Sequence, residues 1–145
     1  MRRRVGTIRD NFPDCLVLIK SGNFYRCYDD DSYIIAYLMD YQVKATVLND
    51  MAGFPLDSLN KVLDKLEMNR VDYKIFEFEN GIAKLKQKCD FQEDNCYEGV
   101  LERAERYVKV RDRISNVTDI LYKNIENARI EDAISKIAQI IYNEL

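Results

Sequence analysis

The stretch that decides the fold runs from Ser21 to Tyr28 and reads Ser-Gly-Asn-Phe-Tyr-Arg-Cys-Tyr. It follows a short apolar run, Cys15–Ile19, and it precedes three aspartates, Asp29–Asp31. Gly-Asn is typical of a turn, so the sequence predicts a strand before it and a second strand, or a continuation after a kink, behind it. The aromatic residues are denser here than a buried strand requires, which raises the question of whether one ring points outward.

Side chains alternate between the two faces of a strand, so Phe24 and Arg26 are predicted to share one face, and Tyr25 and Cys27 the other. Tyr25 and Cys27 suit the core side, which leaves Phe24 exposed beside Arg26. The alternative is that Phe24 is buried and that Tyr25 is the exposed ring. For Arg26 the alternative is an ordinary solvated arginine.

The chain has 145 residues, which is enough for one domain or for one domain with a helical appendage. Its net charge of −3 excludes a uniformly basic protein, so any nucleic-acid surface must be a local patch. No apolar run approaches the length of a membrane span. No apolar stretch follows Met-Arg-Arg-Arg, so a signal peptide is not expected and the cytoplasm is the expected location.

The residues of common catalytic sites are scarce. The chain has no histidine, which removes the commonest general base, and it has no Gly-x-x-x-x-Gly-Lys motif for a nucleotide. Its four cysteines, at positions 15, 27, 89 and 96, lack the spacing of a zinc site, so we expect buried, reduced thiols. The sequence therefore predicts a non-enzymatic protein with neither a metal nor a cofactor.

The first part of the chain is predicted to mix helices and strands. A helix capped by Asp31 or Ser32 extends to about Met39, and Asn80-Gly81 between two strand-like runs is a strong hairpin signal. The other predicted elements are a strand at Val43–Leu48, a helix from Pro55 to about Asn69, and strands at Val71–Glu79 and Ile82–Phe91.

After Phe91 the pattern becomes helical, with apolar residues three and four positions apart. Three amphipathic stripes are predicted, with Ser115 or Asn116 capping the second and a break around residues 127–130. The fold class predicted is α/β (α+β): a mixed β-sheet flanked by helices in residues 1–91, followed by a C-terminal helical module in residues 92–145. The module would serve packing, oligomerisation or docking.

Two motifs in this order resemble the N-terminal mismatch-recognition domain, domain I, of the MutS family. The run from Asp14 through Gly-Asn-Phe-Tyr-Arg26 resembles the family's apolar strand followed by Gly-Asp-Phe-Tyr-Glu. Met51-Ala-Gly-Phe-Pro-Leu-Asp-Ser-Leu59 resembles the family's Met-Ala-Gly-(Val/Ile)-Pro-Tyr-His-(Ser/Ala). The similarity covers roughly residues 12–80, and it implies a small stand-alone relative of that domain.

The resemblance implies binding in the DNA minor groove, with Phe24 stacking on a mispaired base. Arg26 takes the place of the family's glutamate, and arginine cannot accept a hydrogen bond from a base. An exposed aromatic ring next to a guanidinium also suits the minor groove on physical grounds. Asn23, Phe24 and Arg26 are therefore the predicted DNA contacts on this strand, with relaxed mismatch specificity and with unpaired or DNA–RNA hybrid duplexes as further ligands.

Basic residues elsewhere are predicted to add phosphate contacts. Arg2, Arg3 and Arg4, with Arg9 as a further member, would form a basic arm; the alternative is a solubilising terminus. Lys44 would lie on the same side of the sheet as Phe24. Lys84, Lys86 and Lys88 alternate along one strand and are predicted to face one way, as a phosphate track or as the solvated face of a hairpin.

The sequence of the helical module is compatible with more than one kind of partner. Its stripes suit either an intramolecular bundle or a homo-oligomer, and a partner from a repair or reverse-transcriptase complex is a further expectation drawn from the resemblance. The main hypothesis is a DNA-binding protein related to mismatch repair. The alternative is a protein-interaction adaptor, for example an accessory protein of such a complex, that has lost direct mismatch reading.

Overall fold

The computed structural model describes residues 8–145, and the chain divides into two compact units. Unit 1 ends at Val108, and unit 2 comprises Lys109–Leu145. Unit 1 contains the sheet, and unit 2 contains only helices and their connection. The predicted boundary between residues 91 and 92 stays a prediction; the units divide later because Tyr97, Val100 and Ala104 pack into the core of unit 1.

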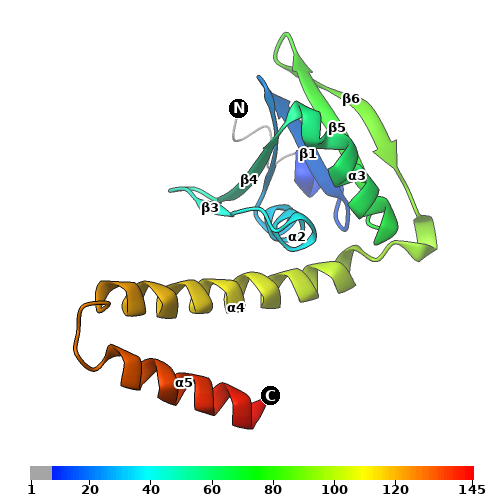
Figure 1. Ribbon diagram of the computed structural model, residues 1–145. Helices are drawn as coiled ribbons and strands as arrows, with labels where there is room; N and C mark the ends of the chain where they lie inside the picture. Colours follow the sequence, from blue (N-terminus) through cyan, green and yellow to red (C-terminus); the bar gives the residue numbers. More distant parts are fainter. Residues whose placement is uncertain (1–7) are drawn as a thin grey trace. The chain divides into compact units, whose positions relative to one another are not determined.

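Within the described residues, the sheet has six strands in the order β3-β4-β2-β1-β5-β6 (Figure 1). β1 and β5 run parallel, and every other neighbouring pair runs antiparallel, so the sheet is mixed, as predicted. The strands are β1 (Leu16–Ser21), β2 (Phe24–Tyr28), β3 (Lys44–Ala45), β4 (Asp50–Pro55), β5 (Tyr73–Glu79) and β6 (Ile82–Cys89).

The helices confirm the predicted α+β class with a helical C-terminal part. A short 3₁₀ turn precedes each of two helices: η1 (Leu56–Ser58) leads into α3, and η2 (Gln92–Asp94) comes just before α4. The helices with both ends in the described residues are α2 (Asp30–Met39), α3 (Leu59–Met68), α4 (Tyr97–Lys123) and α5 (Ile130–Glu144), and residues 8–10 are also helical.

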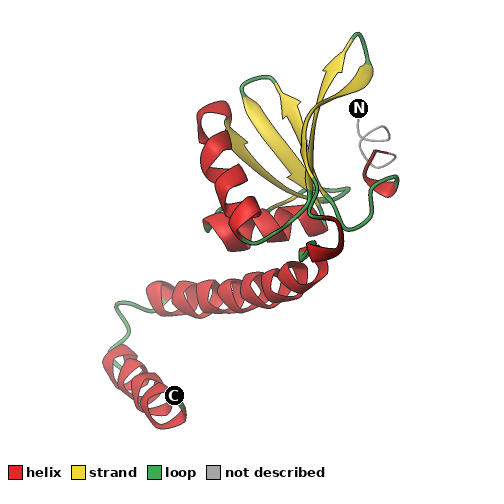
Figure 2. Cartoon of the chain, turned by 90° about the vertical axis from the view of Figure 1, so that its right-hand side faces the viewer, coloured by secondary structure: helices red, strands yellow, loops and turns green. Residues whose placement is uncertain are grey.

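The two faces of the sheet are covered differently (Figure 2). One face carries Leu16, Leu18 and Phe54, which pack with buried residues of α2, α3 and the first turns of α4 in the main core. The opposite face carries Val17, Ile19 and Phe76, which form a smaller cluster. The partly buried side chains packed against this smaller cluster are Ile8, Phe12, Tyr28, Phe78 and Ala83.

Two tight turns set the strand registers. Gly22 has φ of +61°, which matches the first central position of the type II′ turn that joins two antiparallel strands. Asn80 and Gly81 both have positive φ, 51° and 76°, as a type I′ hairpin requires, so the predicted Asn-Gly hairpin is confirmed.

Three predicted features are wrong. The helix predicted to be capped by Asp31 or Ser32 begins earlier, at Asp30, with Asp29 at the N-cap position. The predicted strand Val43–Leu48 shrinks to β3, because the chain reverses at Thr46–Asn49, where the Thr46 hydroxyl donates to the Asn49 carbonyl oxygen at 2.7 Å. The predicted cap at Ser115 or Asn116 does not exist, because α4 continues through both residues to Lys123. The break predicted around residues 127–130 is confirmed, since α5 begins at Ile130.

The lysines of β6 do not face one way, contrary to prediction. A register shift places Gln87 opposite Ile75 and Leu85 opposite Phe76, so that Lys86 interrupts the alternation. Lys84 and Lys86 both form ion pairs with the Glu79 carboxylate. These two cations are therefore partly neutralised by Glu79.

All four cysteines are free thiols, and Cys15 and Cys27 are buried as predicted. The prediction of burial is wrong for Cys96, which is exposed, and Cys89 is only half-buried. The described part of the chain contains no cluster of three or more histidine, cysteine, aspartate or glutamate side chains suited to a metal ion. None of its helices combines the length and the hydropathy needed to span a membrane.

Candidate nucleic-acid interface

Phe24 begins β2 and is 45% exposed, whereas Cys27 is fully buried and Tyr25 packs against the main core. The two-residue turn at Gly22 and Asn23 produces this arrangement, because it pairs Phe24 with Ser21 on β1 and so fixes the register of the whole hairpin. A slip by one residue would send the Phe24 ring to the core side. The exposed ring is therefore a consequence of the turn.

Cross-strand pairing places Phe24 in a row of side chains on the face opposite the helices. Pro55 of β4 lies opposite Phe24, and Gly53 lies opposite Arg26. Pro55 and Gly53 are both exposed. Pro55 and Gly53 thus leave this face of β2 and β4 exposed next to the ring, and Gly53 contributes no side chain to it.

Arg26 lies two residues after Phe24 on the same face, between Ile19 of β1 and Gly53 of β4. Its side chain runs past Gly53, since its Cγ atom lies 3.5 Å from the position that a Gly53 Cβ atom would occupy. Within residues 8–145, no carboxylate forms an ion pair with the Arg26 guanidinium. Among the described residues, Arg26 is therefore a positive charge without an ion-pair partner next to an exposed ring.

The other predicted contacts are placed as follows. Asn23 is exposed in the turn directly before Phe24. Lys44 is exposed on β3. It pairs with Met51 of β4, and Met51 pairs with Tyr28 of β2. Lys44 therefore lies on the same face of the sheet as Phe24, but at the Tyr28 end of β2. The predicted contacts Arg2, Arg3 and Arg4 lie outside the described residues.

Arg9 does not act as a free member of a basic arm. Its guanidinium forms ion pairs with all three aspartates that follow β2, at 3.3 Å to Asp30, 3.4 Å to Asp31 and 3.7 Å to Asp29. The three aspartates follow the opposite end of β2 from Phe24, and Phe24 and Tyr28 at the two ends of this strand are about 13 Å apart at the rise of a strand. Arg9 thus offsets part of the acidic charge at that end, and the acidic run does not surround the ring.

Asp31 is the buried member of this group, with 1% of its surface exposed. It accepts hydrogen bonds from the Tyr97 hydroxyl at 2.6 Å and from the Val17 backbone N–H at 3.1 Å, in addition to the ion pair with Arg9. Burial raises the pKa of Asp31 to about 6, although all three partners act to lower it. The carboxylate thus joins β1, α2 and α4 to the segment that contains Arg9.

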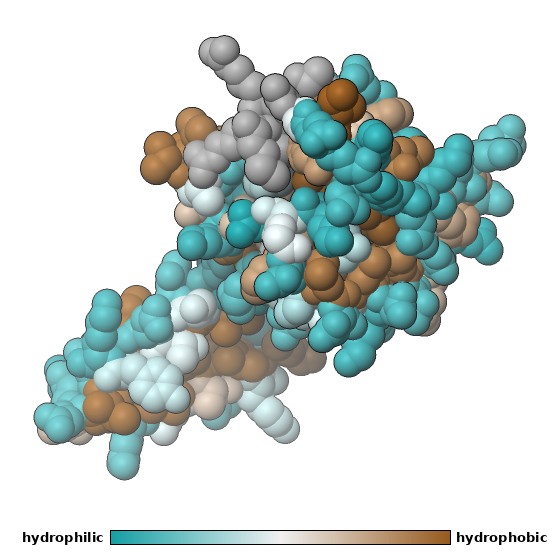
Figure 3. All heavy atoms as spheres, turned by 90° about the horizontal axis from the view of Figure 1, so that it is seen from above, coloured by the Kyte–Doolittle hydropathy of each residue, from teal (hydrophilic) through white to brown (hydrophobic). Residues whose placement is uncertain are grey.

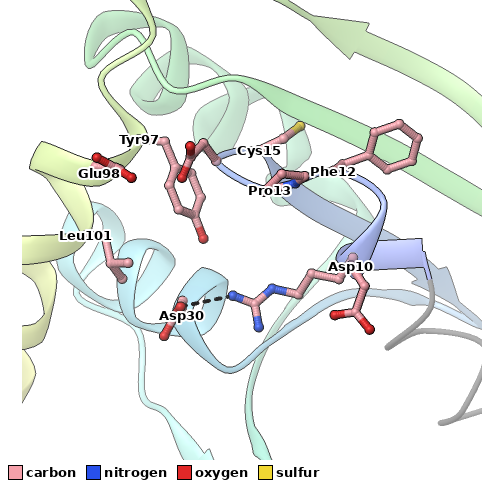
Figure 4. A pocket seen from close by; sticks show the side chains of 10 residues that line it. Asp10, Phe12, Pro13, Cys15, Asp30, Tyr97, Glu98 and Leu101 are labelled. Atoms are coloured by element: carbon pink, nitrogen blue, oxygen red, sulfur yellow. Dashed lines mark ion pairs between the residues drawn. The ribbon is translucent and has the colours of Figure 1, made fainter.

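The same segment borders a pocket of about 500 Å³ in unit 1 (Figure 4). Asp10, Asp30 and Glu98 line it from three different elements, and the marked ion pair joins Asp30 to Arg9. Carboxylates repel phosphate groups, so this pocket is a poor site for nucleic acid. It lies at the acidic end of β2, away from Phe24.

Sequence reasoning missed the contributions of Gly53 and Pro55 to the open face. The signal was present, because Met51–Pro55 alternates between residues that are buried in the core, Ala52 and Phe54, and residues that are not. This alternation is the pattern of a strand, but the stretch precedes a helix and contains glycine and proline, which disfavour strands.

The comparison with protein families agrees with the geometry. The family model for MutS domain I matches residues 1–108, which is most of the chain and ends where unit 1 ends. No curated protein matches the chain as a relative. MutS domain I is the mismatch-recognition domain, a DNA-binding and non-catalytic module. With its mixed sheet, its exposed Phe24 and this match, the chain belongs to the MutS domain I family.

Proposed function

We propose that unit 1 binds duplex DNA at mispaired, distorted or unpaired positions, with Phe24 as an aromatic wedge and Arg26 as the adjacent cation. The observation that carries the proposal is the position of Phe24, which is 45% exposed on the sheet face opposite the helices. Apolar wedges of this kind enter the minor groove and unstack one base step. The remaining contacts proposed are Asn23, Lys44 and the arginines at positions 2–4.

The preference for defects follows from the energy of unstacking. Separating a stacked step costs a few kcal/mol, and it costs least where base pairing is already broken. A ring that must enter the stack therefore binds a defect more tightly than it binds regular duplex. Because the cost falls wherever pairing is already broken, bulges and DNA–RNA hybrids with unpaired bases belong to the same ligand class.

Arg26 explains why the mismatch specificity is proposed to be relaxed. It stands where the resemblance places a glutamate, whose carboxylate can accept a hydrogen bond from a mispaired base, whereas a guanidinium has donors only. A permanent cation also attracts the phosphates of every duplex. Arg26 therefore raises the affinity for all duplexes and lowers the discrimination between them.

The adaptor alternative predicts a Phe24 ring that is buried or surrounded by Asp29–Asp31. The exposure of Phe24 and the ion pairs of the aspartates with Arg9 both favour the DNA-binding proposal over it. A partner from a repair or reverse-transcriptase complex is a further proposal, and it rests on the family resemblance. A cytoplasmic location is also a proposal, and it rests on the sequence composition.

The test is a fluorescence-anisotropy titration on four probes of equal length: regular duplex, duplex with one mispair, duplex with one bulged base, and a DNA–RNA hybrid. Wild-type protein is expected to bind all four, with the bulged and mispaired probes bound more tightly. Arg26→Glu is expected to bind every probe more weakly and to increase the ratio between mispaired and regular duplex. Equal affinity of the wild-type protein for regular and defective duplexes would contradict the proposal.

A further inference from the structure

Unit 2 exposes many large apolar side chains, although in a folded pair of helices such side chains usually pack against a neighbouring element. No residue of α5 is buried, and within α4 the buried residues end at Val108. Large apolar side chains reach the surface here among hydrophilic ones (Figure 3). The exposed members in this unit are Val110, Ile114, Val117, Ile120, Tyr122, Ile125, Ile134, Ile140, Ile141, Tyr142 and Leu145.

Apolar residues of both helices, five of them exposed and three of them (Leu121, Ile130 and Ile137) half-buried, follow the spacing of a helix–helix seam. In α5, Ile130, Ile134, Ile137 and Ile141 are separated by four, three and four positions. The part of α4 in unit 2 repeats this spacing with Val110, Ile114, Val117 and Leu121. A repeat of 3.5 residues made of β-branched and leucine side chains is the pattern that packs into the seam of another helix.

The contact between α4 and α5 within one chain does not cover these seams. A shallow apolar pocket of about 430 Å³ remains beside the connection of the two helices, lined by Leu121, Ile130 and Ile137. Further from the connection, Ile114 is 62% exposed and Ile141 is 52% exposed. Eleven large apolar side chains of unit 2 are each at least 45% exposed, whereas monomeric proteins rarely expose contiguous apolar patches larger than a few hundred Å².

The charges of the two helices indicate what covers the seams. The unit 2 part of α4 carries Lys109, Arg111, Arg113 and Lys123 against Asp112 and Asp119, a net charge of +2. α5 carries Glu131, Asp132 and Glu144 against Lys136, a net charge of −2. The two segments also match in length, since Lys109–Lys123 is as long as α5, which has 15 residues, or about 22 Å.

We propose that unit 2 is a dimerisation module in which α4 of one copy packs against α5 of a second copy, and α5 against α4. The two helix pairs then form a four-helix bundle whose core consists of the 4-3-4 seams. A two-fold axis satisfies both charge pairings at once, because the same surface is used by both copies.

The first test is the mass of the full chain in solution, measured by sedimentation equilibrium. The wild-type protein is expected to have twice the mass of one chain, and Ile134→Lys, which puts a charge in the α5 seam, is expected to be monomeric. Ile82→Lys is the matched control, since Ile82 is equally apolar and is exposed on β6 of unit 1. It is expected to remain dimeric. A monomeric wild-type protein would overturn the proposal.

A charge exchange separates pairing between copies from pairing within one copy. One variant, Lys109→Glu with Arg113→Glu, gives α4 a net charge of −2; the other, Glu131→Lys with Glu144→Lys, gives α5 a net charge of +2. Each variant alone is expected to be monomeric, because like charges face each other in its dimer. The mixture is expected to form a heterodimer, because both interfaces then join opposite charges.

Two outcomes of the mixing experiment would overturn the proposal: a mixture that stays monomeric, or single variants that dimerise as the wild-type protein does. Circular dichroism of each variant checks that the helix content is kept, so that unfolding is not taken for dissociation. The DNA titration of unit 1 is independent of this result, so failure of the dimer leaves the proposed function standing. If both hold, two linked DNA-binding units would raise the affinity for one duplex through avidity.

Discussion

Phe24 and Arg26 lie two residues apart on the same face of β2, with Pro55 and Gly53 opposite them on β4. The ring is exposed, and the guanidinium has no ion-pair partner within residues 8–145. The opposite face of the same strand buries Cys27 in the main core. One short strand thus separates a hydrophobic interior from an aromatic and cationic surface.

Arg26→Gln tests the contribution of this cation to DNA binding. Removing one phosphate-neutralising charge is expected to reduce the slope of log K against log salt by about 1. Lys61→Gln is the control, because Lys61 is exposed on α3, on the helix-covered side of the sheet. An unchanged slope for Arg26→Gln, measured between about 50 and 200 mM salt, would show that Arg26 stays away from the phosphates.

Gly22→Ala tests the turn that sets the register of β2. A Cβ atom at Gly22 would meet no atom within 4 Å, so the expected loss of about 1 kcal/mol arises from the positive φ of +61° alone. Gly99→Ala is the matched comparison: Gly99 also has open space but lies in α4, where alanine is expected to stabilise by about 0.5–1 kcal/mol. Urea denaturation that gave both variants the same sign would contradict this account.

The buried carboxylate of Asp31 predicts a pH dependence of stability. Its pKa is raised to about 6 in the folded protein, so between pH 4 and pH 6 the folded state binds more protons than the unfolded state. The free energy of unfolding contributed by Asp31 is therefore fully present below about pH 4 and is lost as the pH rises through about 6, a change of about 3 kcal/mol.

Asp31→Asn is expected to remove this decline, so that its unfolding free energy changes less than that of the wild-type protein between about pH 4 and about pH 7. Asp119→Asn, at an exposed position of α4, is the control and is expected to keep the wild-type profile. Parallel profiles for Asp31→Asn and the wild-type protein would show that Asp31 does not titrate in this range.

Local sequence rules correctly predicted which residues of β2 are exposed. They failed where the position of a side chain depends on segments that are distant in the sequence. Alternation assigned Phe24 and Cys27 to opposite faces because a two-residue turn and a core on one side leave a single register. The ion pair of Arg9 with Asp31 could not be predicted, because the two residues are far apart in the sequence. Only the fold brings the Arg9 guanidinium within 3.4 Å of the Asp31 carboxylate. The bulge at Lys86 likewise depends on the pairing of β5 with β6.

The prediction of the helix boundaries after Phe91 was wrong for a different reason. Ser115 and Asn116 are good capping residues, but they also lie easily on the exposed side of a continuous helix, and α4 has no proline to end it there. Apolar spacing predicted where the helices lie, and it did not predict how many turns each one has before the chain reverses.

The central claim is that the Phe24 ring enters the base stack, and 2-aminopurine placed next to a mispair measures this directly, because its fluorescence rises when it is unstacked. Wild-type protein is expected to raise the fluorescence on binding, and Phe24→Ala is expected to bind more weakly and to leave the fluorescence of the bound probe unchanged, with Ile82→Ala as an exposed apolar control that behaves as the wild-type protein does. If Phe24→Ala binds with wild-type affinity and produces the same rise in fluorescence, the ring does not act as a wedge.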